Sequence, residues 1–301
     1  MKRFFVLFFI ITVNASAQQL PMYSQYMFNM MNINPAYAGF RNTGNVTMLY
    51  RNQWNKIPGA PITGNISYDS RLENQNHGWG VQAYFDRLGI ENRSGVQGNY
   101  SFKASFKKSA LHVGISAGLL NYNTNFRQTN PFDAGDPALT TNLRAFIPTF
   151  GAGIIYETEK WYAALSLPSF FKTRLLDIND PRVQIAGNEA HYFLTAGYIH
   201  KMDEDLVLRP SVLVKAVSGA PLQYDLNLNL WLGEKFAIGA SYRSTDALLG
   251  LAELQVHSRL RLGYAYDYTL SEIGNYSRGN HELMLRFDVG RVDENVKRKY
   301  F

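Results

Sequence analysis

Hydrophobic and polar positions alternate one by one along much of the chain. In the stretch "PLQYDLNLNLWL", the even-numbered residues from Leu222 to Leu232 are apolar, and most of the residues between them, such as Asp225, are polar. The stretches 260–268 and 282–289 repeat this pattern with charged residues on the polar face. Successive side chains of a β-strand point to opposite faces, so a period of two predicts strands with one apolar and one wet face.

Fourteen segments of this kind follow one another along the sequence. Most are about ten residues long, which is enough to cross a bilayer at a tilt of about 45°. An even number of strands is typical of bacterial single-chain outer-membrane barrels. The predicted fold class is all-β: a transmembrane antiparallel up-and-down β-barrel of about 14 strands with a short N-terminal helical segment. The segments begin near Asn45, Ile62, Gly78, Gly95, Leu111, Phe146, Lys160, His191, Leu206, Leu222, Phe236, Ala247, Arg259 and His281.

The connections between the segments alternate in length, as expected for a barrel with short periplasmic turns and longer external loops. Short links such as "ENQN", "KKS" and "MDED" follow even-numbered segments. The longest links follow the fifth and seventh segments, and "LSEIGNYSRGN" follows the thirteenth. The links after the ninth and eleventh segments are short exceptions. This alternation favours a barrel independently of the strand count.

A soluble β-sandwich would also alternate apolar and polar residues. A sandwich of fourteen ten-residue strands would be unusually large, and its apolar face would have to be hidden in a core. Aromatic residues near the strand ends suit the girdles of an outer-membrane barrel better. The residues that predict these girdles are Tyr50, Trp54, Trp79, Trp161, Trp231 and Tyr268.

Residues 18–40 follow a different period and form a predicted amphipathic segment, either periplasmic or luminal, ahead of a barrel domain at 41–301. The residues at helical spacing are Tyr23, Tyr26, Met27, Met30, Met31 and Asn34. Pro35 limits the length of the helix, and Gly39 permits a bend into the first strand. Two interpretations stay open. The stripe packs against the barrel wall or inside the lumen, where pliable thioethers fill irregular space, or it docks a periplasmic or cargo partner.

The first seventeen residues have the pattern of a secretory signal peptide. Lys2 and Arg3 precede an apolar run at 4–13 and a small-residue cleavage site, which predicts cleavage near Ala17/Gln18. The apolar run is about half the length that a membrane-spanning helix needs. We therefore expect export from the cytoplasm and, with the barrel pattern, an outer-membrane location in contact with lipid.

The composition narrows the possible chemistry. The chain contains no cysteine, which excludes disulfides, thiolate metal sites and an acylated N-terminal cysteine. Its 30 basic and 24 acidic side chains give a net charge of +6. Loss of Lys2 and Arg3 with the signal peptide leaves 28 − 24 = +4. This mild excess is not typical of a nucleic-acid-binding protein, and no nucleic-acid partner is expected.

No set of residues predicts catalysis, a metal site or a cofactor. The stretch "GISAG" around Ser116 matches the serine hydrolase motif, but strand alternation continues through it without the required strand-to-helix turn. The histidines are scattered singly, as expected for rim or lumen positions. Aspartates in the two longest links miss the spacing of an EF-hand, so solvated loop acids are favoured over a calcium site. These aspartates are Asp133, Asp136, Asp177 and Asp180. The protein is therefore not expected to be an enzyme.

Several stretches carry a resemblance to a known family. The stretch "YSQYMFNMMNINPAYAG" at 23–39 resembles the N-terminal signature of the PorP/SprF family, outer-membrane proteins of the type IX secretion and gliding apparatus of Bacteroidetes. The likeness covers nearly the whole chain after the signal peptide. The further matching stretches are "RNQW" at 51–54, "GASYRSTDALLG" at 239–250, "LRLGYAYDYTLSEI" at 260–273 and "GNHELMLRF" at 279–287.

The resemblance implies a barrel without catalytic residues that works with other secretion components, such as the periplasmic ring, or with a large secreted surface adhesin. The long links would face the medium and hold an exported protein. The runner-up function is a passive porin-like channel for small solutes, because a barrel of this size can leave a water-filled lumen. The candidate partner-binding residues are Tyr23, Tyr26, Met27, Met30, Met31, Phe126, Phe132, Phe170 and Phe171.

Overall fold

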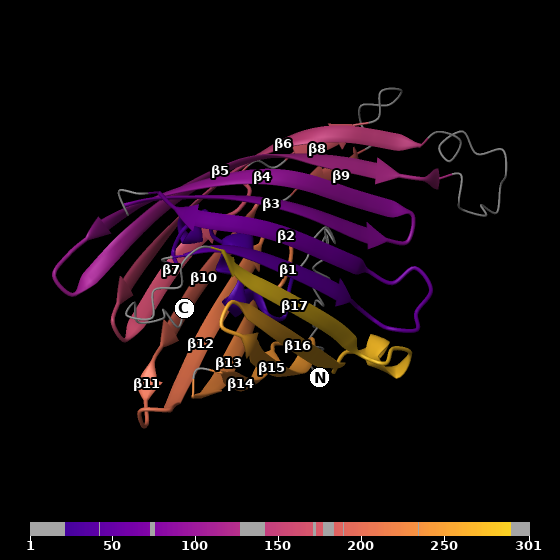
Figure 1. Cartoon of the computed structure of the whole chain (residues 1–301). Coiled ribbons are helices and arrows are strands. Elements are labelled where there is room, and N and C mark those ends of the chain that lie inside the picture. The colour runs from indigo at the N-terminus through magenta and orange to yellow at the C-terminus, as the bar shows by residue number, and fades with distance from the viewer. Residues whose placement is uncertain are drawn as a thin grey trace, which may run out of the picture.

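The chain forms a closed ring of antiparallel strands in the computed structural model (Figure 1). Neighbouring strands of the ring pair in sequence order, β1 pairs with β17, and β10 pairs with β12. The predicted 14-stranded barrel is confirmed. No helix in the described residues is long and apolar enough to cross a membrane. The structure describes residues 22–41, 43–72, 76–126, 142–170, 173–176, 184–188, 190–233 and 235–289.

All fourteen predicted segments correspond to strands of the ring. The three longest, β4 to β6, have 15, 16 and 16 residues and far exceed the predicted ten. A further hairpin, β8 (Thr173–Leu176) with β9 (Gln184–Asn188), lies in the link after β7 and was not predicted. The short strand β11 (His200–Lys201) pairs with β12. The ring consists of β1 (Gly44–Asn52), β2 (Ile62–Arg71), β3 (His77–Leu88), β4 (Glu91–Ser105), β5 (Ser109–Thr124), β6 (Leu143–Thr158), β7 (Trp161–Leu167), β10 (His191–Tyr198), β12 (Leu206–Val217), β13 (Gln223–Leu232), β14 (Phe236–Arg243), β15 (Ala247–His257), β16 (Leu260–Thr269) and β17 (Asn280–Val289).

The alternating apolar and polar residues of each strand form the outer and inner faces of the barrel wall. Outward-facing side chains are apolar and exposed, as at Ile115 (60%) and Leu226 (51%). The side chains between them point into the lumen, where Asn227 and Asn229 are buried. An apolar outer face and a polar lumen are what a bilayer requires of a barrel.

The aromatic residues near the strand ends divide between the two faces. Tyr50, Trp79, Trp161 and Tyr268 have exposed side chains, as a girdle requires. Trp231 is only 5% exposed, so its prediction as a girdle residue was wrong. Odd-numbered residues of β13 face inward, so Trp231 packs in the lumen.

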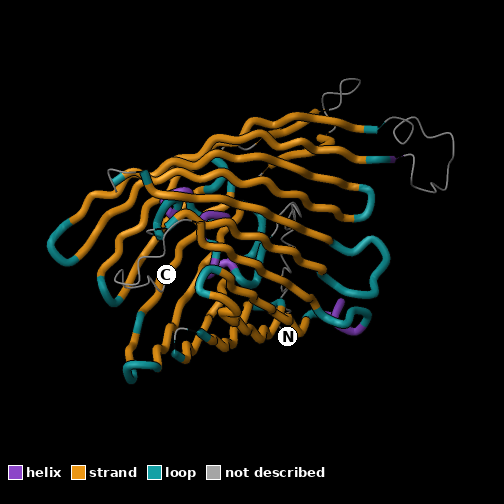
Figure 2. Tube along the Cα trace, viewed as in Figure 1, coloured by secondary structure: helices purple, strands orange, loops and turns teal. Residues whose placement is uncertain are grey.

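The two ends of the barrel differ in their connections (Figure 2). One end, called here the long-connection end, carries the links 53–61, 125–142, 168–190 and 270–279. The other, called the short-turn end, joins β2 to β3, β4 to β5, β6 to β7 and the later pairs by brief turns. The link between β3 and β4 is a third short exception, because the strands pair out to Leu88 and Glu91. Gly89, with a φ of +56°, closes this tight turn.

Residues 22–40 lie inside the barrel, and their backbone corrects the predicted helix. They form three separate turns of 3₁₀ helix: η1 (Tyr26–Phe28), η2 (Met30–Asn32) and η3 (Pro35–Tyr37). Asn29 and Asn34 break the segment with φ values of −140° and −144°. An amphipathic helix needs a wet face, whereas the lumen wall buries both sides of this segment and bonds to its polar groups. The predicted bend is confirmed at Gly39, which has a φ of +62°.

Candidate functional site

The buried segment 22–40, called here the plug, runs through the lumen from one end to the other. Near its start, Ser24 lies beside the ends of β1 and β16 and the start of β17, at the long-connection end. Near its end, Gly39 bonds to Asp69 of β2, close to the short-turn end. The plug therefore lies along the path that a solute would follow through the barrel.

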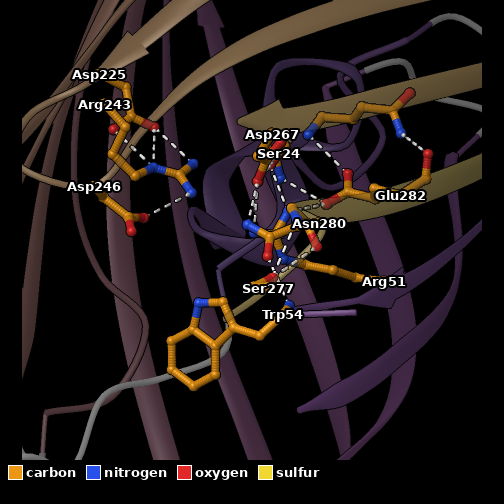
Figure 3. A network of polar contacts seen from close by, with 12 residues as sticks. Ser24, Arg51, Trp54, Asp225, Arg243, Asp246, Asp267, Ser277, Asn280 and Glu282 are labelled. Carbon is orange, nitrogen blue, oxygen red and sulfur yellow. Dashed lines mark hydrogen bonds and ion pairs between the residues drawn. The ribbon is translucent and has the colours of Figure 1, made fainter. Parts of the chain in front are cut away.

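A charged cluster holds the start of the plug (Figure 3). The Glu282 carboxylate accepts hydrogen bonds from the backbone N–H groups of Ser24, at 2.7 Å, and Gln25, at 2.8 Å. The Ser24 hydroxyl donates to Asp267 at 2.8 Å and accepts from Arg51 Nη1 at 2.5 Å. Arg51 also pairs with Asp267 at 2.6 Å and with Glu282 at 3.2 Å. We call Ser24, Arg51, Asp267 and Glu282 the latch.

The latch is enclosed, and its charges depend on one another. The side chains of Arg51, Asp267 and Glu282 are at most 3% exposed. Asn280 Nδ2 donates a further hydrogen bond to Asp267 at 3.1 Å. A buried ion is costly unless its partners satisfy it, so removing one member leaves the others under-compensated. Without the plug, Glu282 would lose two of its donors, which couples the seating of the plug to the charge balance of the wall.

The rest of the plug is tied to the wall by polar contacts from many strands. Asn29 donates to Ser67 of β2 at 2.9 Å, and Asn227 of β13 donates to the Tyr26 hydroxyl at 2.6 Å. Two backbone carbonyls of the plug accept from wall serines: Ile33 from Ser166 at 2.7 Å and Ala38 from Ser101 at 2.6 Å. The plug thus bonds to both sides of the barrel.

Glycines in the wall allow the plug to approach closely. An added Cβ at Gly114 would lie 2.2 Å from the backbone nitrogen of Ala36, and one at Gly78 would lie 2.1 Å from the Ala38 carbonyl oxygen. Both contacts are with backbone atoms, so they could be relieved only by moving the plug. Similar Cβ contacts with plug side chains occur at Gly80, Gly153 and Gly263. The wall is therefore shaped for this segment.

The apolar part of the plug packs on Trp231. The Phe28 ring meets the Trp231 indole edge-on, with centroids 6.3 Å apart. The guanidinium groups of Arg209 and Arg261 lie 5.5 Å and 5.1 Å from the same indole. Cation–π contacts of this kind hold arginines inside the lumen while the indole receives the plug.

The structure brings five of the candidate partner-binding residues together in the lumen. They are Tyr23, Tyr26, Met27, Met30 and Met31, each at most 6% exposed. Phe126 and Phe170 lie apart from them, in the links at the long-connection end, where Phe170 is 43% exposed. Phe132 and Phe171 lie outside the described residues. Partner binding by these residues stays a prediction.

Ser116 and two of the scattered histidines, His112 and His200, lie in strands. Ser116 lies in the middle of β5, facing the lumen, with its Oγ near the position that a Cβ on Gly151 would take. His112 is buried and lies 2.9 Å from Glu157, whereas His200 is exposed. Within the described ranges, no group of three or more histidines or acidic residues could hold a metal ion. The four loop aspartates lie outside those ranges.

The comparisons with known proteins decide the family. The family model described as "Type IX secretion system membrane protein PorP/SprF" matches residues 15–287. The chain belongs to this family. No curated protein matches the sequence.

Solved structures show the same fold as this PorP/SprF member at low identity. Omp33 of Acinetobacter baumannii is 10% identical, with 83% of this chain and 100% of Omp33 covered and a TM-score of 0.50. The toluene transporter TodX of P. putida is 10% identical, with 87% and 94% covered and a TM-score of 0.50. The monoaromatic hydrocarbon channel CymD is 12% identical, with 90% and 94% covered and a TM-score of 0.50. Family and fold together place the chain in the outer membrane.

Four of the five stretches that carry the PorP/SprF resemblance meet at the latch. Ser24 belongs to the N-terminal signature, and Arg51 begins "RNQW". Asp267 and Glu282 belong to the stretches 260–273 and 279–287. The fifth stretch, 239–250, contains Arg243, which pairs with Asp225 at 2.9 Å in the lumen (Figure 3). Sequence reasoning missed the latch, although inward-facing charges within these motifs were a signal that could have found it.

Proposed function

We propose that this PorP/SprF protein is a non-enzymatic outer-membrane anchor that binds other type IX secretion components, a secreted surface adhesin, or both. The observation that supports this function best is the latched plug. A barrel whose polar lumen is filled by its own chain presents surfaces and loops to partners, whereas free diffusion needs an open path. The plug therefore favours binding over the porin-like alternative.

The long-connection end is the proposed contact surface for an exported protein. Longer loops face outward in barrels of this kind, and the short turns face the periplasm, where the secretion components would bind. Phe170 stands 43% exposed at this end, and Tyr276 in the link 270–279 is 79% exposed. Exposed aromatic side chains near loops are frequent anchors of protein interfaces.

Affinity purification of the tagged protein from its native membrane, in mild detergent, tests this function. We expect secretion components or an adhesin to be recovered in defined stoichiometry. Replacing Phe170→Ser should reduce recovery of an exported partner about tenfold, the usual effect of losing an aromatic anchor. Phe106→Ser is the matched control, because Phe106 is 58% exposed in the turn between β4 and β5, at the short-turn end, and its loss should leave recovery of an exported partner unchanged.

Two results would overturn the proposal. One is a folded, correctly located protein that purifies without any secretion component or adhesin. The other is a steady ohmic current through the native protein in a planar bilayer, which would assign it to solute transport instead.

A further inference from the structure

The polar lining of the lumen is divided into two kinds of surface. On the side of β13 to β17 and β1, charged side chains such as Arg51, Asp267 and Arg243 face inward and are paired. On the side of β2 to β4, the middle of the wall holds neutral inward amides, including Asn65, Gln82 and Gln97. The inward carboxylates Asp69 and Asp86 lie nearer the two ends of these strands. The latch holds the start of the plug on the charged side.

A cavity of about 70 Å³ lies between the plug and the neutral side. Its lining comes mainly from the half of each strand nearer the long-connection end, and two plug residues, Tyr23 and Asn32, close it from the lumen. None of the ten lining residues is charged. A single water needs about 10–15 Å³ of such space, so the cavity has room for roughly five to seven water-sized groups.

Buried amide atoms in this lining lack hydrogen-bond partners. Asn65 and Gln82 are 7% and 4% exposed, and Asn65 Oδ1 and Gln82 Oε1 have no partner among the described residues. Neither amide atom of Asn32 has one. Gln82 Nε2 is already used, because it donates to Gln97 Oε1 at 3.1 Å. The unpaired wall atoms, Asn65 Oδ1 and Gln82 Oε1, are therefore hydrogen-bond acceptors. A bound molecule with hydrogen-bond donors would satisfy them.

The chemistry of the lining selects the ligand by charge. An uncharged group with N–H donors and its own acceptors, such as a peptide unit, can satisfy Asn65, Gln82 and Asn32 together. An ammonium or carboxylate would enter a recess whose lining offers no opposite charge, and losing its water would be costly.

We infer that this recess binds a short, uncharged peptide segment of an exported partner that enters from the long-connection end. The inference rests on the proposed function and names the site and the chemistry of the partner. The segment offers backbone N–H groups to Asn65 and Gln82, while Asn32 of the plug both donates and accepts. Binding then connects the partner to the plug through Asn32.

Calorimetric titration of the full-length protein in detergent tests the inference. The probe is N-acetylglycine methylamide, a small neutral peptide with two N–H groups, compared with N-acetylglycine, which ends in a carboxylate, and glycine methylamide, which begins with an ammonium group. We expect saturable binding of the neutral peptide and at least about tenfold weaker binding of both charged analogues. Asn65→Leu and Gln82→Leu should each weaken the neutral peptide about fivefold. Asn121→Leu is the matched control. Asn121 of β5 does not line the recess, and its side chain donates a hydrogen bond to Ser94 of β4 on an exposed part of the wall.

Each variant is first checked for a folded barrel by its heat-modifiable migration on a gel. The inference is overturned if the neutral peptide does not bind, if the charged analogues bind equally well, or if Asn121→Leu has the same effect as Gln82→Leu. Binding of glucose without binding of the peptide would assign the recess to saccharides and also overturn the inference. Recovery of secretion components by a protein that fails this titration would leave the proposed function intact.

Discussion

Arg51 and Glu282 lie directly opposite each other across the seam where the first strand of the barrel meets the last. The alternation of the sequence places both residues on the inward face of their strands. It could not pair them, because they are 231 positions apart and meet only when the ring closes. The role of Ser24 could not be predicted either, since it lies outside the stripe of helical spacing. Each charge could thus be assigned to the lumen, but the latch could not be assembled from sequence.

Replacing Glu282→Gln tests the latch. Glutamine keeps the shape of the side chain but removes the negative charge and one of the two oxygens that accept from Ser24 and Gln25. We expect the start of the plug to be held less tightly by about 2 kcal/mol, because hydrogen bonds to a buried charge are lost. This corresponds to roughly thirtyfold faster exchange of the protected backbone hydrogens at Ser24 and Gln25, measured by hydrogen exchange and mass spectrometry.

Glu272→Gln is the control for this substitution. Glu272 is exposed in η6 (Glu272–Asn275), at the same end of the barrel, so the variant loses the same charge without touching the plug. Exchange at Ser24 and Gln25 should match that of the native protein. Unchanged exchange in Glu282→Gln would show that the other wall contacts, and not the latch, hold the start of the plug.

The strands could be predicted from sequence far better than the plug. A period of two describes a wall with one face in lipid and one in a polar lumen, and this environment is the same for every strand. The plug experiences no such division, because protein surrounds it on all sides. Its Asn29 and Asn34 bond to the wall and to the local backbone instead of continuing a helix. Helical spacing therefore located the segment correctly but gave the wrong backbone, which the contacts with the barrel determine.

Gly114→Ala tests whether the wall is fitted to η3. The new methyl group would overlap the backbone of Ala36, which cannot rotate away as a side chain could. We expect a loss of about 1–3 kcal/mol of unfolding free energy, typical of overpacking, measured by urea unfolding in lipid vesicles. Gly250→Ala is the matched control in β15, because a Cβ there meets nothing within 4 Å and should change stability by less than about 0.5 kcal/mol. Equal stability of the two variants would mean that the plug moves aside easily.

The whole barrel poses a question that strand patterns alone cannot answer: what occupies the lumen. Fourteen strands predict a ring wide enough for a water-filled channel. The same sequence pattern fits an open or a filled barrel, because inward positions are polar in both. Here the lumen is filled by a segment that precedes the first strand, and glycines at Gly78 and Gly114 make room for it. The occupant had to be found from three-dimensional contacts.

Deletion of residues 23–33 tests whether the plug is needed for a folded ring or only for a closed lumen. The plug contributes no strand to the sheet. The ring therefore keeps its backbone hydrogen bonds between strands when the segment is removed. Water would enter and hydrate the latch carboxylates and the wall amides, which offsets much of the cost of the lost contacts. We therefore expect a folded but less stable barrel that carries a steady ohmic current in a planar bilayer, whereas the native protein carries none.

The current is the decisive measurement, because it separates the two interpretations of the plug. A deletion variant that fails to fold would show that the plug is an integral part of the barrel core. A folded variant that stays sealed would show that other parts of the chain close the lumen. If the variant conducts and also loses the partner that the native protein recovers, then closing the lumen and holding the partner depend on the same segment, as contact through Asn32 requires.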